Sequence, residues 1–186
     1  MSRIKKLYDR EYFLTSVEGA KEFLRSKGLK LSSRLAKVIF LADPKPSDAI
    51  LDLGCGRGEL ILNCALKGST AIGCDFSSDA LKLAKSAIDQ LPLKNNAFLC
   101  QADVKYLPFR DGIFDLIFLI DVAEHLYPDE LRKCLTEIYR VLKSTGTVII
   151  HTDNAWYHNF GSFLLRLINL FLENELELRI NMHFCM

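Results

Sequence analysis

ILDLGCGRGE, residues Ile50–Glu59, places three glycines at alternate positions directly after a short apolar run. A strand that runs into a glycine-rich turn and then into a helix is typical of nucleotide-binding folds. Gly54 permits a tight turn, Gly56 lets a ligand approach the backbone, and the following helix begins with unpaired N–H groups. A tight strand-to-helix turn without a ligand is the alternative, and the density of glycines favours a bound ligand.

Apolar runs of strand length alternate with amphipathic segments of helix length on both sides of this turn. That alternation predicts a doubly wound, Rossmann-like α/β fold, with a mostly parallel sheet of strand order 3-2-1-4-5. Gly146 is expected to lie just past the third helix of the core. The expected strands are 49–53, 70–74, 97–100, 113–120 and 147–152, and the expected helices between them are 57–67, 77–90 and 129–143.

The chain of 186 residues is long enough for a single domain with its own core. We expect an N-terminal helical cap over residues 1–45, with helices near 17–26 and 32–42, and a ligand-binding core over 46–153. Residues 154–186 place a helical apolar face before a strictly alternating, strand-like pattern. This last segment is expected to be a lid-like helix and a final strand.

The charge balance, 24 Lys and Arg against 23 Asp and Glu, gives no general attraction for nucleic acids or anionic membranes. A more basic N-terminal part is interpreted as a solvated face. Six cysteines without a CxxC pair suit a reducing compartment. With no signal peptide and no transmembrane segment in the sequence, we expect a cytoplasmic protein.

Three acidic residues decide which nucleotide the turn suits. Asp75 ends the second apolar run, beside the glycine turn, where a carboxylate can accept both hydroxyls of a ribose. NAD-binding proteins use the same arrangement, so an NAD-dependent oxidoreductase is the first alternative. Glu59 stands where a dinucleotide fingerprint has its third glycine, and its charge would repel a pyrophosphate. Asp52 adds negative charge that suits an amino group and a sulfonium cation.

CQADVKYLPF, residues Cys100–Phe109, follows the third strand. The Asp103 carboxylate can accept a hydrogen bond from the exocyclic amine of adenine, and the Val104 N–H can serve a ring nitrogen. Taken alone, Asp103 is more often a helix N-cap. Together with the glycine turn and Asp75, it is interpreted as a ligand group.

These motifs resemble the class I S-adenosylmethionine-dependent methyltransferases, in the subgroup that includes ubiquinone- and menaquinone-methylating enzymes. The resemblance covers about residues 46–153 and rests on four motifs in order: ILDLGCGRGEL, AIGCDFS, ADVKYLPFRDGIFDLIFLIDVAEHL and IYRVLKSTGTVII. It implies S-adenosyl-L-methionine as cofactor and methyl transfer to oxygen or carbon of a small molecule. The residues that it implies for cofactor binding are Asp52, Gly54, Cys55, Gly56, Gly58, Asp75, Phe76, Asp103, Val104, Ile120, Tyr8 and Tyr12.

Two residues after the fourth strand are the candidates for catalysis. His125 can act as a base, because it follows the fourth strand at the mouth of the sheet and imidazole is a common general base, or it can cap the loop before Pro128. Asp121 can orient the acceptor or the cofactor amine. His151, His158 and His183 lack metal-ligand spacing, so no metal is expected.

The chain lacks, after the fourth strand, the Asn- or Asp-Pro-Pro-Tyr and Pro-Cys motifs of enzymes that methylate DNA bases, which argues against that activity, so no nucleic-acid partner is expected. Aromatic residues over 156–171 suggest an apolar or aromatic acceptor, and an ordinary packed helix is the alternative. Methyltransferases of this class end with an antiparallel strand pair, so the chain is expected to be truncated before it. A cofactor-binding but inactive module is the second alternative. The oligomeric state is left open.

Overall fold

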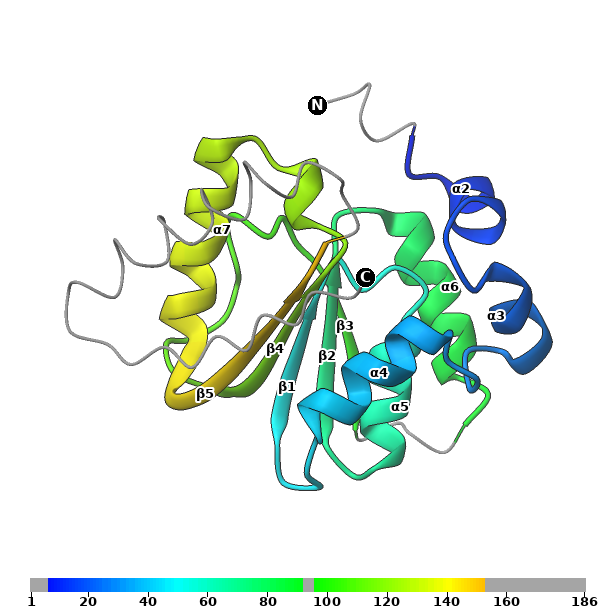
Figure 1. Cartoon of the computed structure of the whole chain (residues 1–186), viewed down its shortest axis with the longest axis horizontal. Coiled ribbons are helices and arrows are strands. Elements are labelled where there is room, and N and C mark those ends of the chain that lie inside the picture. Colours follow the sequence, from blue (N-terminus) through cyan, green and yellow to red (C-terminus); the bar gives the residue numbers. More distant parts are fainter. Residues whose placement is uncertain (1–6, 92–95, 153–186) are drawn as a thin grey trace.

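A five-stranded parallel sheet with the order β3-β2-β1-β4-β5 forms the centre of the computed structural model, which describes residues 7–91 and 96–152 (Figure 1). This confirms the predicted doubly wound fold and its strand order. The strands are β1 Ala49–Leu53, β2 Thr70–Asp75, β3 Ala97–Gln101, β4 Phe114–Ile120 and β5 Leu142–His151.

Helices cover both faces of the sheet, with α4, α5 and α6 on one side and α7 on the other (Figure 1). Both faces are therefore buried, which explains why the strands are continuous apolar runs. The helices are α2 Arg10–Thr15, α3 Ala20–Ser26, α4 Ser33–Ala42, α5 Glu59–Leu66, α6 Ser78–Ile88, the short 3₁₀ helix η1 Ala123–His125, and α7 Pro128–Val141.

Alternate residues of the strands supply two separate hydrophobic cores. Leu51 and Leu119 point to the side of α7, where they pack in one cluster with Leu131. Ile50 and Phe118 point to the opposite side and belong to the cluster of α4 and α5. Because each strand is held on both faces, the carboxyl ends of the strands form a fixed platform.

Over residues 7–45, the N-terminal cap contains three helices where the sequence predicted two. α2 begins after Asp9, whose side chain accepts a hydrogen bond from the Tyr12 N–H at 2.9 Å. An aspartate at that position is a favourable N-cap. The cap helix α4 begins in the same way, with the Ser32 hydroxyl accepting from the Leu35 N–H.

The boundary between α7 and β5 differs from the expected one. α7 ends at Val141 and β5 begins directly at Leu142, with no turn between them. Phe114 pairs with Leu142, and the next pair is Leu116 with Thr147, so β5 carries an irregularity that contains Gly146. A Cβ on Gly146 would lie 2.7 Å from a Leu142 side-chain carbon. Gly146 is therefore placed by close packing inside a strand, and its predicted position beyond a helix end is wrong.

The predicted division into cap, core and terminal segment stays a prediction, because the expected lid helix, last strand and truncation over 154–186 lie outside the described residues. Within residues 7–91 and 96–152, no helix has the length and apolar character needed to cross a membrane.

Candidate functional site

The glycine turn lies at the carboxyl end of β1 and is fixed by its neighbours. The N–H groups of Gly54 and Cys55 both donate to the Cys74 carbonyl of β2, at 2.8 and 2.9 Å. Gly54 has a left-handed backbone with φ of 74°, and a Cβ there would lie 2.3 Å from Val122 Cγ2. Gly54 therefore serves the close approach of the chain after β4 as well as the turn.

Glycine is required at the other two positions of the turn for different reasons. Gly58 has φ of 82°, and a Cβ there would lie 2.8 Å from the Ala84 Cβ of α6. Gly56 also has positive φ, at 52°, but an added Cβ would meet only ordinary contacts with Phe13. Backbone conformation alone thus requires Gly56, while helix packing also requires Gly58.

Three buried carboxyl groups surround this turn and have different partners. Glu59 forms an ion pair with Arg57, with 2.9 Å between Nη2 and Oε1. Asp75 is 4% exposed and accepts hydrogen bonds from the N–H groups of Gly56 at 3.0 Å and Ser77 at 2.8 Å. Asp52 is 3% exposed, and its side chain has no hydrogen-bond partner in the described part of the chain.

Burial raises the pKa of Asp52 to about 8, and the nearby charges of Asp75 and Glu59 act in the same direction. Burial also raises the pKa of Asp75, against the opposing effect of its backbone hydrogen bonds. The pKa of Glu59 is raised as well, because its burial outweighs the attraction of Arg57. In the described part of the chain, Arg57 pairs with Glu59 and no cation pairs with Asp52 or Asp75, so the site favours a cationic ligand group near Asp52.

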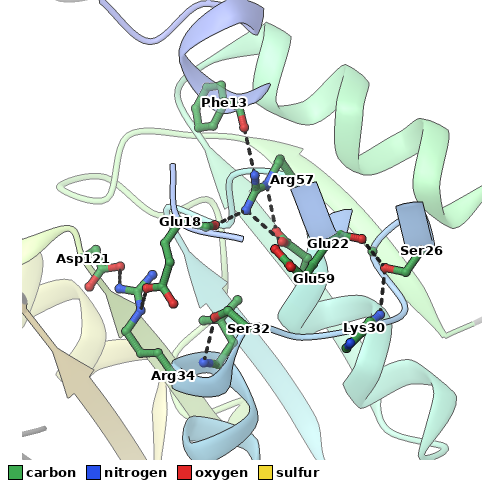
Figure 2. A network of polar contacts seen from close by, with 12 residues as sticks. Phe13, Glu18, Glu22, Ser26, Lys30, Ser32, Arg34, Arg57, Glu59 and Asp121 are labelled. Carbon is green, nitrogen blue, oxygen red and sulfur yellow. Dashed lines mark hydrogen bonds and ion pairs between the residues drawn. The ribbon is translucent and has the colours of Figure 1, made fainter. Parts of the chain in front are cut away.

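Arg57 is a residue of this site that sequence reasoning missed. Its side chain is 2% exposed and donates to the carbonyl oxygens of Phe13 at 2.9 Å and Glu18 at 2.6 Å, besides Glu59 (Figure 2). The guanidinium also lies 5.1 Å from the centre of the Phe23 ring. One buried arginine thus joins the cap to the glycine turn. It also balances the charge of Glu59, so Glu59 alone does not exclude a pyrophosphate.

The loop after β3 brings Asp103 and Val104 to the same edge of the sheet as Asp75. The Ala102 N–H donates to the Asp75 carbonyl at 3.1 Å. The Asp103 carboxylate accepts from the Lys105 N–H at 3.0 Å and closes a turn, and the Val104 side chain packs on the core of α7. No helix starts at Asp103, so the alternative of a helix N-cap is wrong.

Aromatic rings from three segments meet above the ends of β2 and β4. The Tyr8 ring lies 5.0 Å from Tyr12, 5.3 Å from Phe76 and 5.9 Å from His125, measured between ring centres. The Tyr8 carbonyl accepts from the Ser77 hydroxyl at 2.7 Å. Burial raises the pKa of Tyr8, and the nearby acidic groups raise it further. The N-terminal segment thus closes over Phe76, as a lid would.

The ends of β4 and β5 hold a second polar group around Asp121. Ile120 pairs with His151 in the sheet, and Asp121 follows with a left-handed φ of 56°. Its Oδ1 lies 2.7 Å from His151 Nδ1, and its Oδ2 binds the Arg34 guanidinium of α4 (Figure 2). Arg34 also pairs with Glu18, at 2.7 Å between Nε and Oε2.

His125 lies apart from this group. It is exposed in η1, its N–H donates to the Val122 carbonyl at 3.0 Å, and its ring contacts Tyr8. The structure therefore brings the two catalytic candidates into different clusters, with Asp121 next to His151. Among the described residues, no group of three or more His, Cys, Asp or Glu is arranged to hold a metal ion.

The fold and the acidic glycine turn define a class I S-adenosylmethionine-dependent methyltransferase, as predicted. A family profile described as "Methyltransferase domain" matches residues 51–150, which is more than half of the chain. The chain belongs to this family. The match does not favour the alternative of an NAD-dependent oxidoreductase.

Two relatives and one solved structure show the range of similarity. The chain is 38% identical over 103 residues to demethylmenaquinone methyltransferase of Lactiplantibacillus plantarum, covering 54% of this chain and 43% of the relative. It is 33% identical over 143 residues to 2-phytyl-1,4-naphtoquinone methyltransferase of Nostoc sp., covering 73% and 61%. The chain spans about half the length of the curated relatives that it matches.

The structure of a putative S-adenosyl-L-methionine-dependent methyltransferase from Methanococcus maripaludis has a TM-score of 0.67 and 20% identity, and the match covers 89% of this chain and 84% of that one. At this identity the likeness supports the fold alone.

Proposed function

We propose that this chain transfers the methyl group of S-adenosyl-L-methionine to a small aromatic acceptor, at oxygen or carbon. The observation that carries the proposal is the unpartnered, buried Asp52 beside Asp75 at the glycine turn. A buried carboxyl group without a partner can ionise when an ammonium or sulfonium group binds beside it, whereas a pyrophosphate would keep it protonated.

The residues of the first two strand ends would hold the cofactor. Asp52 would receive the ammonium group, while the glycine turn leaves room for the methionine part. Asp75 has lone pairs left on both oxygens beyond its two backbone hydrogen bonds, and these can accept the ribose hydroxyls. The further cofactor residues that we propose are Gly54, Cys55, Gly56, Gly58, Phe76, Asp103, Val104, Ile120, Tyr8 and Tyr12.

Bound S-adenosylmethionine supplies an electrophilic methyl group on a sulfonium leaving group. The protein must therefore align the acceptor and exclude water more than it must activate the methyl group. The Tyr8 cluster would cover the adenine, and Ile120 ends β4 beside the Asp121 group. We expect the acceptor to approach at the ends of β4 and β5.

Reduced naphthoquinones are the acceptor class that we propose to test first. Two relatives carry names of enzymes that methylate naphthoquinones, at 38% and 33% identity. A reduced quinone ring is electron-rich, so its carbon and its hydroxyl oxygen are both nucleophiles. We place the reaction in a reducing cytoplasm, since the five described cysteines are free thiols.

The test is transfer of a labelled methyl group from S-adenosylmethionine to reduced 2-phytyl-1,4-naphthoquinone by the full chain. We expect a methylated product with the wild type and none above background with Asp75→Ala. A folded wild type that binds S-adenosylhomocysteine yet methylates no reduced naphthoquinone would contradict the acceptor class.

A further inference from the structure

We infer that His151 and Asp121 form the acid–base pair of this site, with His151 Nε2 taking the acceptor's proton and Arg34 holding Asp121 in position. This inference rests on the proposed methyl transfer. His151, and not His125, is then the base.

The geometry at the ends of β4 and β5 carries the inference. His151 is 5% exposed, and its Nδ1 lies 2.7 Å from Asp121 Oδ1. A carboxylate at Nδ1 accepts that N–H, which fixes the tautomer and makes Nε2 the basic nitrogen. The Asp121 N–H also donates to the His151 carbonyl at 2.9 Å, so backbone and side chain hold the pair together.

The charged groups connected to the pair are two carboxylates and one guanidinium. Arg34 binds Asp121 Oδ2, but its guanidinium is shared with Glu18, at 2.7 Å from Nε to Oε2. Asp121, Arg34 and Glu18 thus form a chain of two carboxylates and one guanidinium (Figure 2), and Asp121 connects this chain to His151. The excess negative charge stabilises the imidazolium that forms when the proton is taken up.

The backbone of Asp121 points to the same site. Its φ of 56° is an unfavourable conformation for a residue with a side chain. Such conformations persist when surrounding contacts hold them, and they gather at active sites. Here the contacts are Arg34 and His151, so the strain is maintained by the same groups that orient the carboxylate.

The histidine expected from the sequence lacks these features. His125 is exposed and contacts the ring of Tyr8, and in the described part of the chain no carboxylate pairs with it. Its role in the loop after β4 is therefore packing of the lid. Of the two histidines that the structure describes, His151 has an orienting acid and His125 does not.

The proposed step balances as follows. His151 Nε2 takes the proton from a hydroxyl of the reduced naphthoquinone, and the freed electron pair drives the oxygen, or the conjugated ring carbon, to attack the methyl carbon. The methyl–sulfur bond breaks, and its electrons stay on sulfur, which leaves neutral S-adenosylhomocysteine. When the ring carbon attacks, the oxygen becomes a carbonyl; the ring carbon then loses its own proton and the oxygen regains one, which restores the aromatic ring and its hydroxyl, so that one proton is released in all. The imidazolium releases its proton to solvent.

The first test compares His151→Gln with His125→Gln in methyl transfer to reduced 2-phytyl-1,4-naphthoquinone. We expect His151→Gln to lower kcat at least about 100-fold, with unchanged affinity for S-adenosylhomocysteine and loss of the acidic limb of the pH–rate profile. His125→Gln should keep more than a tenth of the wild-type kcat. A larger loss in His125→Gln than in His151→Gln would overturn the inference.

A second test does not depend on turnover. In the full chain labelled with ¹⁵N-histidine, long-range ¹H–¹⁵N correlations should show the His151 proton on Nδ1, and Asp121→Asn should abolish that tautomer preference. A His151 proton on Nε2 in the wild type would overturn the pair. If the wild type binds S-adenosylhomocysteine but no acceptor reacts, the acceptor proposal fails, while this measurement still decides the inference.

Discussion

The two halves of the strand-end platform differ in how their carboxyl groups are satisfied. At the end of β1, Asp52 has no hydrogen-bond partner among the described residues. At the end of β4, Asp121 binds Arg34 through one oxygen and His151 through the other. The first half is short of a cation, and a ligand can supply it. In the second half both carboxylate oxygens of Asp121 have partners, so this half is suited to orienting a catalytic group.

The cap is attached to both halves, each time by a buried or half-buried arginine. Arg57 ties α2 and the segment before α3 to the glycine turn, and Arg34 ties α4 to Asp121 (Figure 2). Arg57 is 2% exposed, whereas the Arg34 side chain is 15% exposed. The first arginine should therefore matter mainly for stability, and the second mainly for catalysis.

Arg57→Ala is expected to give the largest loss of stability. The change leaves Glu59 buried without its partner and frees two backbone carbonyl groups, which typically costs about 3–5 kcal/mol. The melting temperature should fall by roughly 10 °C. Arg110→Ala, at an exposed position, is the control and should shift it by less than about 2 °C. Equal melting temperatures for both variants would contradict the structural role of Arg57.

Gly54→Ala should destabilise the chain by about 2–3 kcal/mol, because the new methyl group would meet Val122 and the backbone is left-handed. Gly56→Ala should cost less, since φ is positive there but the new methyl group would make only ordinary contacts with Phe13. Urea unfolding of both variants measures the difference. Adding Val122→Ala to Gly54→Ala should recover part of the loss, and no recovery would show that the contact with Val122 is unimportant.

Asp52→Asn tests the raised pKa of Asp52 through the pH dependence of stability, and its role in the site through ligand binding. With a folded-state pKa of about 8, Asp52 stays protonated in the folded chain between pH 4 and 8 while the unfolded chain ionises. Stability therefore falls as the pH rises through this range, by at most about 1.4 kcal/mol per pH unit, and the loss levels off above pH 8. Thermal unfolding against pH should show that Asp52→Asn removes this slope and weakens S-adenosylhomocysteine binding. A variant with the wild-type slope would contradict the raised pKa.

Arg34→Gln should have the smallest effect on stability, about 1 kcal/mol, because the pair that it breaks is partly exposed. The turnover number should nevertheless fall about tenfold, since Asp121 loses one of its two partners, while S-adenosylhomocysteine affinity stays the same. Lys37→Gln, at an exposed position of the same helix, is the matched control. Equal kcat values for the two variants would contradict a positioning role of Arg34.

Local patterns were sufficient to predict the half of the platform around the glycine turn. The turn, Asp75 and the strand order follow from apolar runs and glycine spacing, which are properties of neighbouring residues. The Asp121 group depends on Arg34, which lies 87 positions away along the chain. No spacing rule connects a cap arginine with a strand-end aspartate, so the pairing with His151 was not predicted and His125 was favoured.

Tertiary packing explains the other two differences between the predicted and the observed structure. Arg57 was not singled out from the sequence, because only the three-dimensional packing of the cap reveals its partners. The end of α7 was misplaced because Gly146 was interpreted as a helix-end signal. Its position is decided by the contact with Leu142 inside β5, which is a matter of tertiary packing.

The most direct test of the account is calorimetric titration of S-adenosylhomocysteine into the full chain at pH 7, in two buffers with different heats of ionisation. We predict saturable binding with release of up to about one proton, because Asp52 ionises when the ligand ammonium arrives, and Asp52→Asn should lose that release. NADH should give no comparable heat. A folded chain that binds NADH but not S-adenosylhomocysteine would contradict the central claim.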